Sequence, residues 1–136
     1  MGSNRKKVLL VDDDRAIRTM YRDLFEKNGF SVHTEESAIG ALEILASGEA
    51  FDVVVTDIMM AKMDGWELLD TIRGMLKLSD TELPVVVISA FESDTLEVKA
   101  YSHGANASFI KGKDPLTKLL RLVRIQTGLE RSKYSD

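Results

Sequence analysis

The sequence predicts an α/β protein in which a parallel β-sheet lies between two layers of helices. Two observations predict this fold class. Short apolar runs that do not alternate with polar residues recur along the chain, as in strands that are covered on both faces. Segments with apolar residues at helical spacing separate these runs, and this alternation is typical of parallel strands joined by right-handed crossovers.

Five strands are predicted, four of them from their apolar runs. The runs are residues 8–11 (VLLV), 53–56 (VVVT), 85–88 (VVVI) and the weaker 107–110 (ASFI). A further strand is expected at residues 31–35, between the first two helical segments. These strands are short, as expected for a small parallel sheet.

A helix is predicted after each strand, from residues that share one helical face. In chain order the faces are Ile17/Met20/Tyr21/Leu24, Ala38/Ala41/Leu42/Leu45, Leu68/Leu69/Ile72/Met75/Leu76, the less apolar stretch 94–102, and Leu116/Leu119/Leu120/Val123. Asp14 is the expected N-cap of the first helix. Five βα units in a chain of this length predict a flavodoxin-like, doubly wound (βα)5 fold, a five-stranded parallel sheet in three α/β/α layers.

The chain of 136 residues, 44% of them hydrophobic, has the size of one globular domain. We expect this domain to span residues 6–127. Residues 1–5 are expected to be a tag remnant or a disordered start, and residues 128–136 a polar tail or the start of a linker.

The formal net charge of -4 argues against nucleic-acid binding by this domain, although a local basic patch is compatible with that average. The sequence has no cysteine, which excludes disulfides and thiolate chemistry. No signal peptide and no membrane-inserting segment are recognisable. We therefore expect a cytoplasmic protein.

Polar residues follow or close four of the predicted strands. They are Asp12, Asp13, Asp57, Ser89 and Lys111. Because ligands bind beyond the carboxyl ends of strands in an open parallel sheet, these side chains are expected to form one site. The carboxylates suit Mg²⁺, whereas no histidine is nearby to favour zinc. The lysine and the hydroxyl suit a phosphoryl group, so the set indicates phosphoryl chemistry.

The chain resembles the receiver domain of two-component response regulators from about Lys6 to Thr127. The motifs that carry the resemblance are VLLVDDDRAIR, VVVTDIMMAKMDGWELL, PVVVISA and GANASFIKG, in this order. The resemblance implies that Asp57 accepts a phosphoryl group with the help of Mg²⁺. It further implies that Asp13 binds the metal directly, that Asp12 acts largely through a metal-bound water, and that the backbone carbonyl of Met59 is another ligand.

The resemblance also assigns roles to the two remaining site residues. Ser89 would bind a phosphoryl oxygen and move toward it, with Ala90 leaving space, and Lys111 would pair with another oxygen. The implied partners are a sensor histidine kinase or a histidine phosphotransfer protein, and a downstream protein target or an output domain missing from this chain. The face made by the fourth helix, the fifth strand and the fifth helix would change on phosphorylation, and a homodimer through it is possible.

Several positions depart from the family pattern. Ala61 and Lys62 replace the usual Pro-Gly. In the family a proline usually follows the lysine through a cis peptide bond, and Gly112 replaces that proline. The bond after Lys111 is therefore expected to be either trans in a rearranged loop or a rare cis bond. Ser108 replaces the aromatic switch residue. Lys113 is a rival for the pocket lysine, although the spacing from Gly104 favours Lys111.

Two other functions compete with the phosphorylation switch. One is an atypical receiver that acts as a constitutive protein-interaction module, which the replacements at Gly112 and Ser108 favour. The other is a haloacid-dehalogenase-like phosphatase, which also uses a strand-end aspartate with Mg²⁺. That family requires an acidic residue two positions after the nucleophile, where this chain has Met59. The second alternative is therefore the weaker one.

Overall fold

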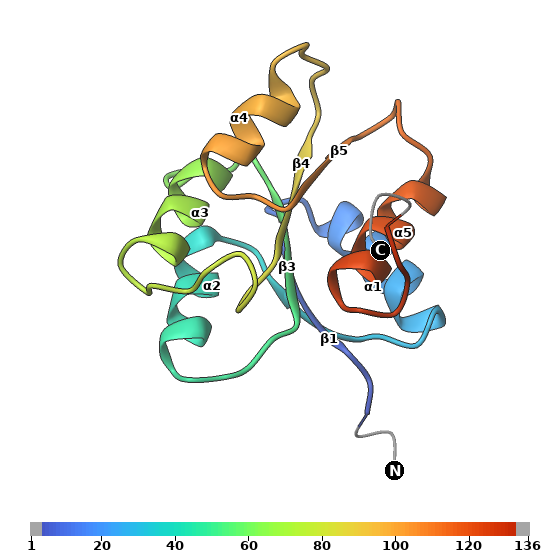
Figure 1. Ribbon diagram of the computed structural model, residues 1–136, viewed down its shortest axis with the longest axis horizontal. Coiled ribbons are helices and arrows are strands. Elements are labelled where there is room, and N and C mark those ends of the chain that lie inside the picture. The colour runs from blue at the N-terminus through green and yellow to red at the C-terminus, as the bar shows by residue number, and fades with distance from the viewer. Residues whose placement is uncertain (1–3, 133–136) are drawn as a thin grey trace.

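The protein was analysed as a computed structural model that describes residues 4–132 and contains five strands and five helices in that range. The strands are β1 (Lys7–Val11), β2 (Ser31–Glu35), β3 (Val53–Asp57), β4 (Val85–Ser89) and β5 (Ala107–Ile110). The helices are α1 (Arg15–Lys27), α2 (Ala38–Ala46), α3 (Gly65–Arg73), α4 (Leu96–Ser102) and α5 (Leu116–Gln126). Strands and helices alternate along the chain, as Figure 1 shows.

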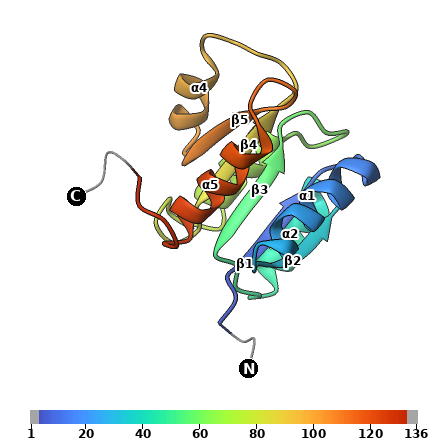
Figure 2. The ribbon, with the colours of Figure 1, turned by 90° about the vertical axis from the view of Figure 1, so that its right-hand side faces the viewer.

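The strands form one parallel sheet in the order β2-β1-β3-β4-β5. Its central position belongs to β3, which pairs with β1 on one side and β4 on the other. The chain order reverses at β1, whose neighbours are β2 and β3, and such a switch point is where a doubly wound sheet binds its ligands. The strands run in the same direction, so that all their carboxyl ends meet at one edge (Figure 2). The predicted fold class is confirmed.

Two apolar cores lie on opposite faces of the sheet. Helices α2, α3 and α4 cover one face, and α1 and α5 cover the other (Figure 1). The strands have side chains in both cores: Leu9 and Val11 of β1 face the first, whereas Val8 and Leu10 face the second. Burial on both faces explains why the strand sequences are continuously apolar.

The helix starts follow from side-chain capping. Asp14 caps α1, as predicted, by accepting hydrogen bonds from the backbone amides of Ala16 and Ile17. Asp64 caps α3 and forms a capping box with Glu67. Both aspartates are at the edge of the sheet where the strands end, so capping fixes the helices against this edge.

Two predicted helix boundaries are wrong. The third helix was expected to include Met75 and Leu76, but α3 ends at Arg73 because Gly74 is its C-cap, and Met75 is 80% exposed. The fourth helix was expected from residue 94, whereas α4 begins at Leu96. The hydroxyls of Ser93 and Thr95 hydrogen-bond to each other there, and such local bonds compete with a helical start.

Arg73 holds together three segments at the amino-terminal edge of β4. Its guanidinium donates to the carbonyl oxygens of Leu78, Leu83 and Gly104, at 3.0, 2.8 and 2.9 Å. It also donates to the side-chain oxygen of Asn106, at 3.2 Å. Burial lowers the pKa of Arg73, and the opposing effect of the Asp80 carboxylate is smaller. The arginine therefore acts as a structural clamp after the end of α3.

Beyond α5 the chain folds back on the helix. The backbone amides of Leu129 and Glu130 both donate to the carbonyl oxygen of Arg124. The predicted start at residues 1–5 and tail at 128–136 lie partly outside the described residues, so these domain limits remain predictions. None of the helices between residues 4 and 132 combines the length and apolar character needed to cross a bilayer.

Candidate functional site

Three carboxylates meet where β1 and β3 end. Asp12 and Asp13 follow β1, and Asp57 closes β3. Each offers an oxygen, and these oxygens lie within 4.8 Å of one another. Asp12 is only 1% exposed and Asp57 only 5%, whereas Asp13 is exposed. The sheet therefore brings the carboxylates together, with two of them largely removed from water.

Lys111 reaches this cluster from the end of β5. Its Nζ donates to Oδ2 of Asp57 at 3.1 Å and to Oδ2 of Asp12 at 3.4 Å. The second oxygen of each carboxylate accepts a hydrogen bond from a backbone amide. Asp12 accepts from the amide of Asp14 at 2.9 Å, and Asp57 accepts from the amide of Met59 at 3.3 Å. These bonds fix the orientation of both buried carboxylates.

The electrostatics of the site favour an additional cation. Burial raises the pKa of Asp12, and the nearby Asp57 carboxylate adds to this effect. For Lys111, burial acts to lower the pKa, but Asp57 and Asp12 outweigh it, and the pKa is raised. Three carboxylates thus face one ammonium that is firmly protonated. The negative charge is not balanced by the side chains that contact it.

The donor set suits Mg²⁺. The ligands of this ion are oxygens, commonly one or two carboxylates with water and phosphate oxygens. Asp13 is accessible to solvent. The hydrogen bonds that Asp12 and Asp57 accept from the amides of Asp14 and Met59 leave lone pairs on both carboxylates for a metal. No histidine belongs to the acidic cluster found within residues 4–132. The residues therefore fit Mg²⁺ better than zinc, although the Met59 carbonyl remains a predicted ligand.

Ser89 lies at the same edge, but its hydroxyl is turned to its own loop. The hydroxyl donates to the carbonyl oxygen of Phe91 at 2.8 Å and accepts from the amide of Phe91 at 3.0 Å. Ser89 is 7% exposed. Within residues 4–132 this hydroxyl forms no hydrogen bond with Asp57 or Lys111, so a phosphoryl group at Asp57 would have to compete with Phe91 for it.

A tight turn after β5 positions Lys111. Its backbone amide extends the sheet by donating to Ser89, at 2.8 Å. No cis peptide bond occurs in the described part of the chain, so the bond from Lys111 to Gly112 is trans. Gly112 has a φ of 78°. The side chain of Asp114 closes the turn by accepting a hydrogen bond from the backbone amide of Ile110 at 2.9 Å. The loop is thus the rearranged trans form, and Gly112 supplies the backbone conformation that a proline lacks.

The rival Lys113 points away from the carboxylate cluster. Its Nζ forms an ion pair with Glu92, in the loop that follows β4. The side chain of Phe109, next to Ser108, is 1% exposed in the core beneath α1 and α5. The lysine that contacts the carboxylate cluster is therefore Lys111, and Phe109 is a core residue.

Two supporting residues were not identified from the sequence. Arg18 donates to the backbone carbonyl of Asp12 at 2.8 Å, and this contact joins α1 to the end of β1. Gly65 is packed so closely on the end of β3 that an added Cβ would lie 2.4 Å from the carbonyl oxygen of Asp57. The Asp-Gly pair indicated a turn, but the close approach of α3 to β3 carries no sequence signal.

Comparison with known proteins places the chain in one family. The family model described as "Response regulator receiver domain" matches residues 8–123. The response regulator MprA of Mycobacterium tuberculosis is 33% identical over 130 residues, which are 96% of this chain and 53% of that protein. The MprA protein of Mycobacterium ulcerans is 32% identical over the same length. The chain spans about half the length of these curated relatives.

Solved structures give the same result. The receiver domain of the Francisella response regulator 1452 has a TM-score of 0.82 with 27% identity, covering 91% of this chain and 98% of that one. The chemotaxis protein CheY4 of Vibrio cholerae has a TM-score of 0.76 with 29% identity, covering 89% of this chain and 98% of that one. Similarity to these structures therefore extends over about nine tenths of this chain.

Proposed function

Because the chain belongs to the response regulator receiver domain family, we propose that it is a phosphorylation-controlled switch whose phosphoacceptor is Asp57. The donor is a histidine kinase or a histidine phosphotransfer protein. The observation that carries this proposal is the convergence of Asp57 with Asp12, Asp13 and Lys111 at one edge of the sheet. The domain acts on no separate substrate, and its output is a change in binding.

The chemistry is a transfer of a phosphoryl group between two side chains. An oxygen of Asp57 forms a bond to phosphorus while the phosphorus–nitrogen bond of the donor phosphohistidine breaks, and the histidine nitrogen keeps the bonding electron pair. Asp57 is suited to this role because its carboxylate is oriented by Lys111 and by the amide of Met59. Orientation and electrostatics are the main contributions that a protein makes to such a transfer.

Lys111 and the acidic pair serve the transferred group. Lys111 Nζ, already beside Asp57, neutralises charge on a phosphoryl oxygen. Asp12, Asp13 and Asp57 would hold Mg²⁺, which would supply further neutralisation of phosphoryl charge. The carboxylate of Asp13 would be the more accessible ligand, because it is exposed whereas that of Asp12 is buried.

Ser89 converts the new charge into a movement of its loop. To donate to a phosphoryl oxygen, its hydroxyl gives up its bond to the Phe91 carbonyl. The loop is also tied to the turn after β5 by the ion pair between Glu92 and Lys113. Phosphorylation therefore changes the hydrogen bonds of the segment that leads directly into α4. A local charge change is in this way coupled to a surface element.

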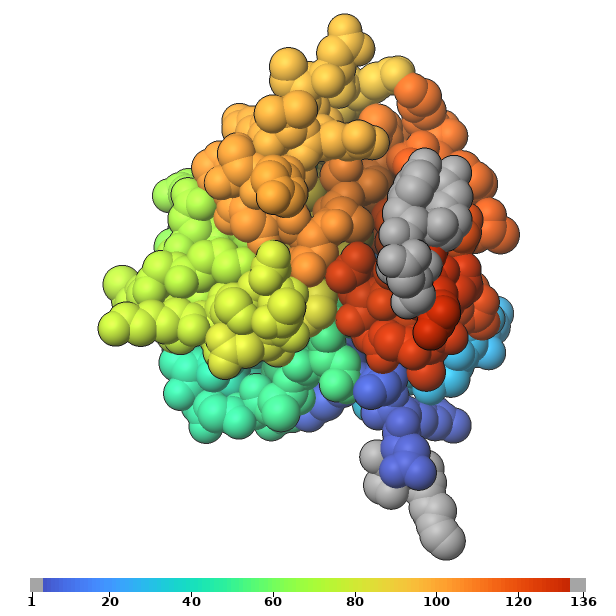
Figure 3. Space-filling view, viewed as in Figure 1, coloured from blue at the N-terminus to red at the C-terminus, as the bar shows by residue number. Residues whose placement is uncertain are grey.

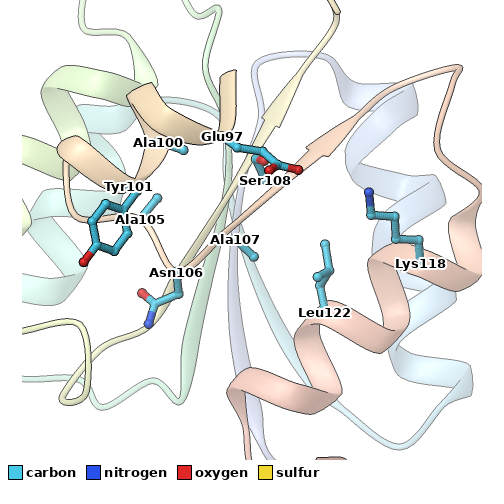
Figure 4. A pocket seen from close by; sticks show the side chains of 9 residues that line it. All are labelled: Glu97, Ala100, Tyr101, Ala105, Asn106, Ala107, Ser108, Lys118 and Leu122. Carbon is cyan, nitrogen blue, oxygen red and sulfur yellow. The ribbon is translucent and has the colours of Figure 1, made fainter. Parts of the chain in front are cut away.

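The output surface is the face made by α4, β5 and α5. A hollow of about 300 Å³ lies there, with Ala100, Ala107 and Ser108 among its lining residues. Figure 4 shows Glu97 on the α4 side and Lys118 and Leu122 on the α5 side of this hollow, and Figure 3 shows the face that contains it. The small side chain of Ser108 leaves this space open where the family has an aromatic ring. A downstream protein target or a second copy of the chain would bind at this face.

The constitutive interaction module remains the competing function, and it differs in one measurable respect: its binding would not depend on Asp57. The phosphatase alternative is not supported. Position 59 carries a methionine, whose thioether has no proton to transfer, and its backbone amide is used to orient Asp57.

The test is intact-mass measurement after incubation with acetyl phosphate and Mg²⁺. We expect the mass to increase by one phosphoryl group, and we expect no increase in the Asp57→Asn variant or when the metal is chelated. Asp64→Asn is the matched control, because asparagine is also a good N-cap and Asp64 caps α3 without belonging to the acidic cluster. That variant should be phosphorylated like the wild type.

A folded wild-type protein that gains no mass requires a second measurement. Beryllofluoride, which mimics an aspartyl phosphate, would be titrated while the fluorescence of Trp66 is recorded. Trp66 lines a hollow together with Asp13 and stacks on His103 at a ring distance of 4.9 Å. A saturable, Asp57-dependent change would support the switch with a selective donor. An unchanged signal would support the constitutive module.

A further inference from the structure

A cluster of four side chains joins α3 to the end of α4. Its members are Trp66 and Asp70 of α3, Lys99 of α4, and His103, which is the C-cap of α4. The imidazole ring of His103 stacks on the indole ring of Trp66, with the ring centroids 4.9 Å apart. Its Nδ1 hydrogen-bonds to Oδ1 of Asp70 at 2.7 Å. The Nζ of Lys99 lies 5.0 Å from the centroid of the Trp66 ring. One histidine thus contacts α3 through both an aromatic ring and a carboxylate.

Helix α4 relies on this cluster because the helix is short. It has seven residues, and two of them are buried. The hydroxyl of its N-cap, Thr95, bonds to Ser93 and does not cap the first turn. The contacts of His103 therefore fix the carboxyl end of α4 to α3, while the amino end follows directly from the loop after β4.

The charge on His103 decides how strong this attachment is. The charged groups that face the ring are Asp70 and Arg73 of α3 and Lys99 of α4. The Nε of Arg73 donates to the carbonyl oxygen of Gly104, so this guanidinium is engaged with the backbone next to the histidine. Strand β5, which packs against α4, has the sequence ASFI and carries no charge. Of these groups, Asp70 is the one that hydrogen-bonds to the imidazole.

We propose that His103 is a pH-responsive lock that holds α4 against α3. When the imidazole is protonated, its hydrogen bond to Asp70 is charge-assisted, and the ring is a cation stacked on the face of Trp66. When the proton is lost to water, the hydrogen bond becomes weaker and the cation–π attraction is lost. The stabilisation is therefore fully present at acid pH and disappears as the pH rises through the range in which histidine titrates, about pH 6.5.

The lock connects two regions of the domain that matter for the switch. Trp66 lines the hollow of about 470 Å³ to which Asp13 also contributes, so the indole lies between the acidic edge and α4. The lock itself does not depend on phosphorylation, because its members are not part of the acidic cluster. On the proposed function, it would restrain the helix that phosphorylation moves, at the end opposite to the Ser89 loop. The response of α4 would then be smaller at acid pH.

The first measurement records the fluorescence of Trp66 in the unphosphorylated protein between about pH 5.5 and pH 8. The chain has one tryptophan and two histidines, so the signal and its source are well defined. We expect a sigmoidal change in emission that is lost in His103→Gln. His33→Gln is the matched control: His33 also bonds to a carboxylate, Glu35, at 2.6 Å, but its ring lies beside Phe51. The control should keep the wild-type change.

The second measurement determines whether protonation strengthens the attachment. His103→Gln should lower the thermal unfolding midpoint by about 2–4 °C near pH 5.5, and by less than about half of that near pH 8. The larger effect at acid pH should vanish when the same substitution is made in the Asp70→Asn protein, because the imidazolium has then lost its carboxylate partner.

Three outcomes would overturn the inference. They are a wild-type emission that does not change with pH, an emission change that persists in His103→Gln, and a loss in thermal midpoint that is the same at both pH values. Because all samples are unphosphorylated, these results reject the lock without bearing on the switch. Absent labelling by acetyl phosphate would reject the switch and leave the lock intact.

Discussion

At the scale of single residues, the site combines carboxylates with different surroundings. Asp12 is almost fully buried, and burial raises its pKa, whereas Asp13 is exposed beside it. A buried carboxylate that lies near other carboxylates is costly unless enough positive charge balances them. The charged form of Asp12 therefore lowers the free energy of unfolding of the metal-free protein. This free energy should change in a defined direction with pH and on substitution of Asp12.

Asp12→Asn should stabilise the metal-free protein at neutral pH. Because the folded-state pKa is above the ordinary value of 3.8, a proton on Asp12 favours the folded state. That stabilisation is fully present below the pKa of Asp12 in the unfolded state and is lost as the pH rises through its pKa in the folded state. The gain from asparagine should thus be largest near neutral pH and should vanish below about pH 3.8. Urea unfolding at several pH values measures it, and a pH-independent difference would contradict it.

Arg73→Ala should destabilise the protein by about 2–3 kcal/mol, because it leaves carbonyl groups of three segments without their donor. Arg121→Ala is the control, since Arg121 is an exposed arginine with one ion pair to Glu130, and its loss should cost about 0.5 kcal/mol or less. Denaturant unfolding measures both. Equal effects would show that the clamp contributes nothing beyond an ordinary surface contact.

Residue types and order predicted which side chains meet, but not how each is oriented. Asp57 and Lys111 were predictable because the carboxyl ends of parallel strands share one edge. The orientation of Ser89 was not, since its hydroxyl bonds to the backbone of Phe91, and backbone groups are the same for every residue type. The clamp at Arg73 escaped prediction for the same reason, because most of its acceptors are carbonyl oxygens.

At the scale of elements, each helix start near the site is fixed to a strand end. Asp14 caps α1 immediately after the β1 carboxylates, and α3 begins at Gly65 with its amide bonded to Ile58 at 2.7 Å. The boundary error at α3 has a related cause. Met75 and Leu76 continue the apolar spacing of the helix, but Gly74 ends it, and periodicity alone does not register a C-cap.

Gly65→Ala should displace the end of β3. The added Cβ would lie 2.4 Å from the Asp57 carbonyl oxygen and 2.7 Å from the Ile58 Cα, and both are backbone atoms that cannot rotate away. We expect a destabilisation of about 1–3 kcal/mol and slower labelling of Asp57 by acetyl phosphate. Gly74→Ala, at the other end of α3, is the control: its Cβ approaches only the Asp70 oxygen, at 3.0 Å. Labelling at the wild-type rate in Gly65→Ala would contradict the prediction.

At the scale of the whole molecule, ligand binding and folding are linked through the acidic edge. The carboxylates come from β1 and β3, which are paired in the sheet, so unfolding separates them. An ion that binds the folded state alone raises the free energy of unfolding. The overall fold was predictable because each apolar run and each helical face indicated the same architecture.

Mg²⁺ should raise the thermal unfolding midpoint of the wild type, with a stabilisation of about 2.7 kcal/mol at a free concentration of about 100 times Kd. Asp13→Asn should remove most of this effect. Asp14→Asn is the matched control, because it removes one neighbouring charge while asparagine still caps α1. Calorimetry in chelator and in Mg²⁺ measures the difference, and an equal loss in both variants would point to a diffuse charge effect.

The bond between Lys111 and Asp12 joins residues that are 99 positions apart in the sequence. During synthesis on the ribosome, the three carboxylates emerge well before the lysine that contacts two of them. A nascent chain that has folded only as far as β4 would gather acidic groups without their ammonium partner. On the proposed function, the contact of Lys111 with Asp57 and Asp12 forms only when β5 joins the sheet, so phosphorylation of Asp57 would be reserved for molecules that have completed the whole domain.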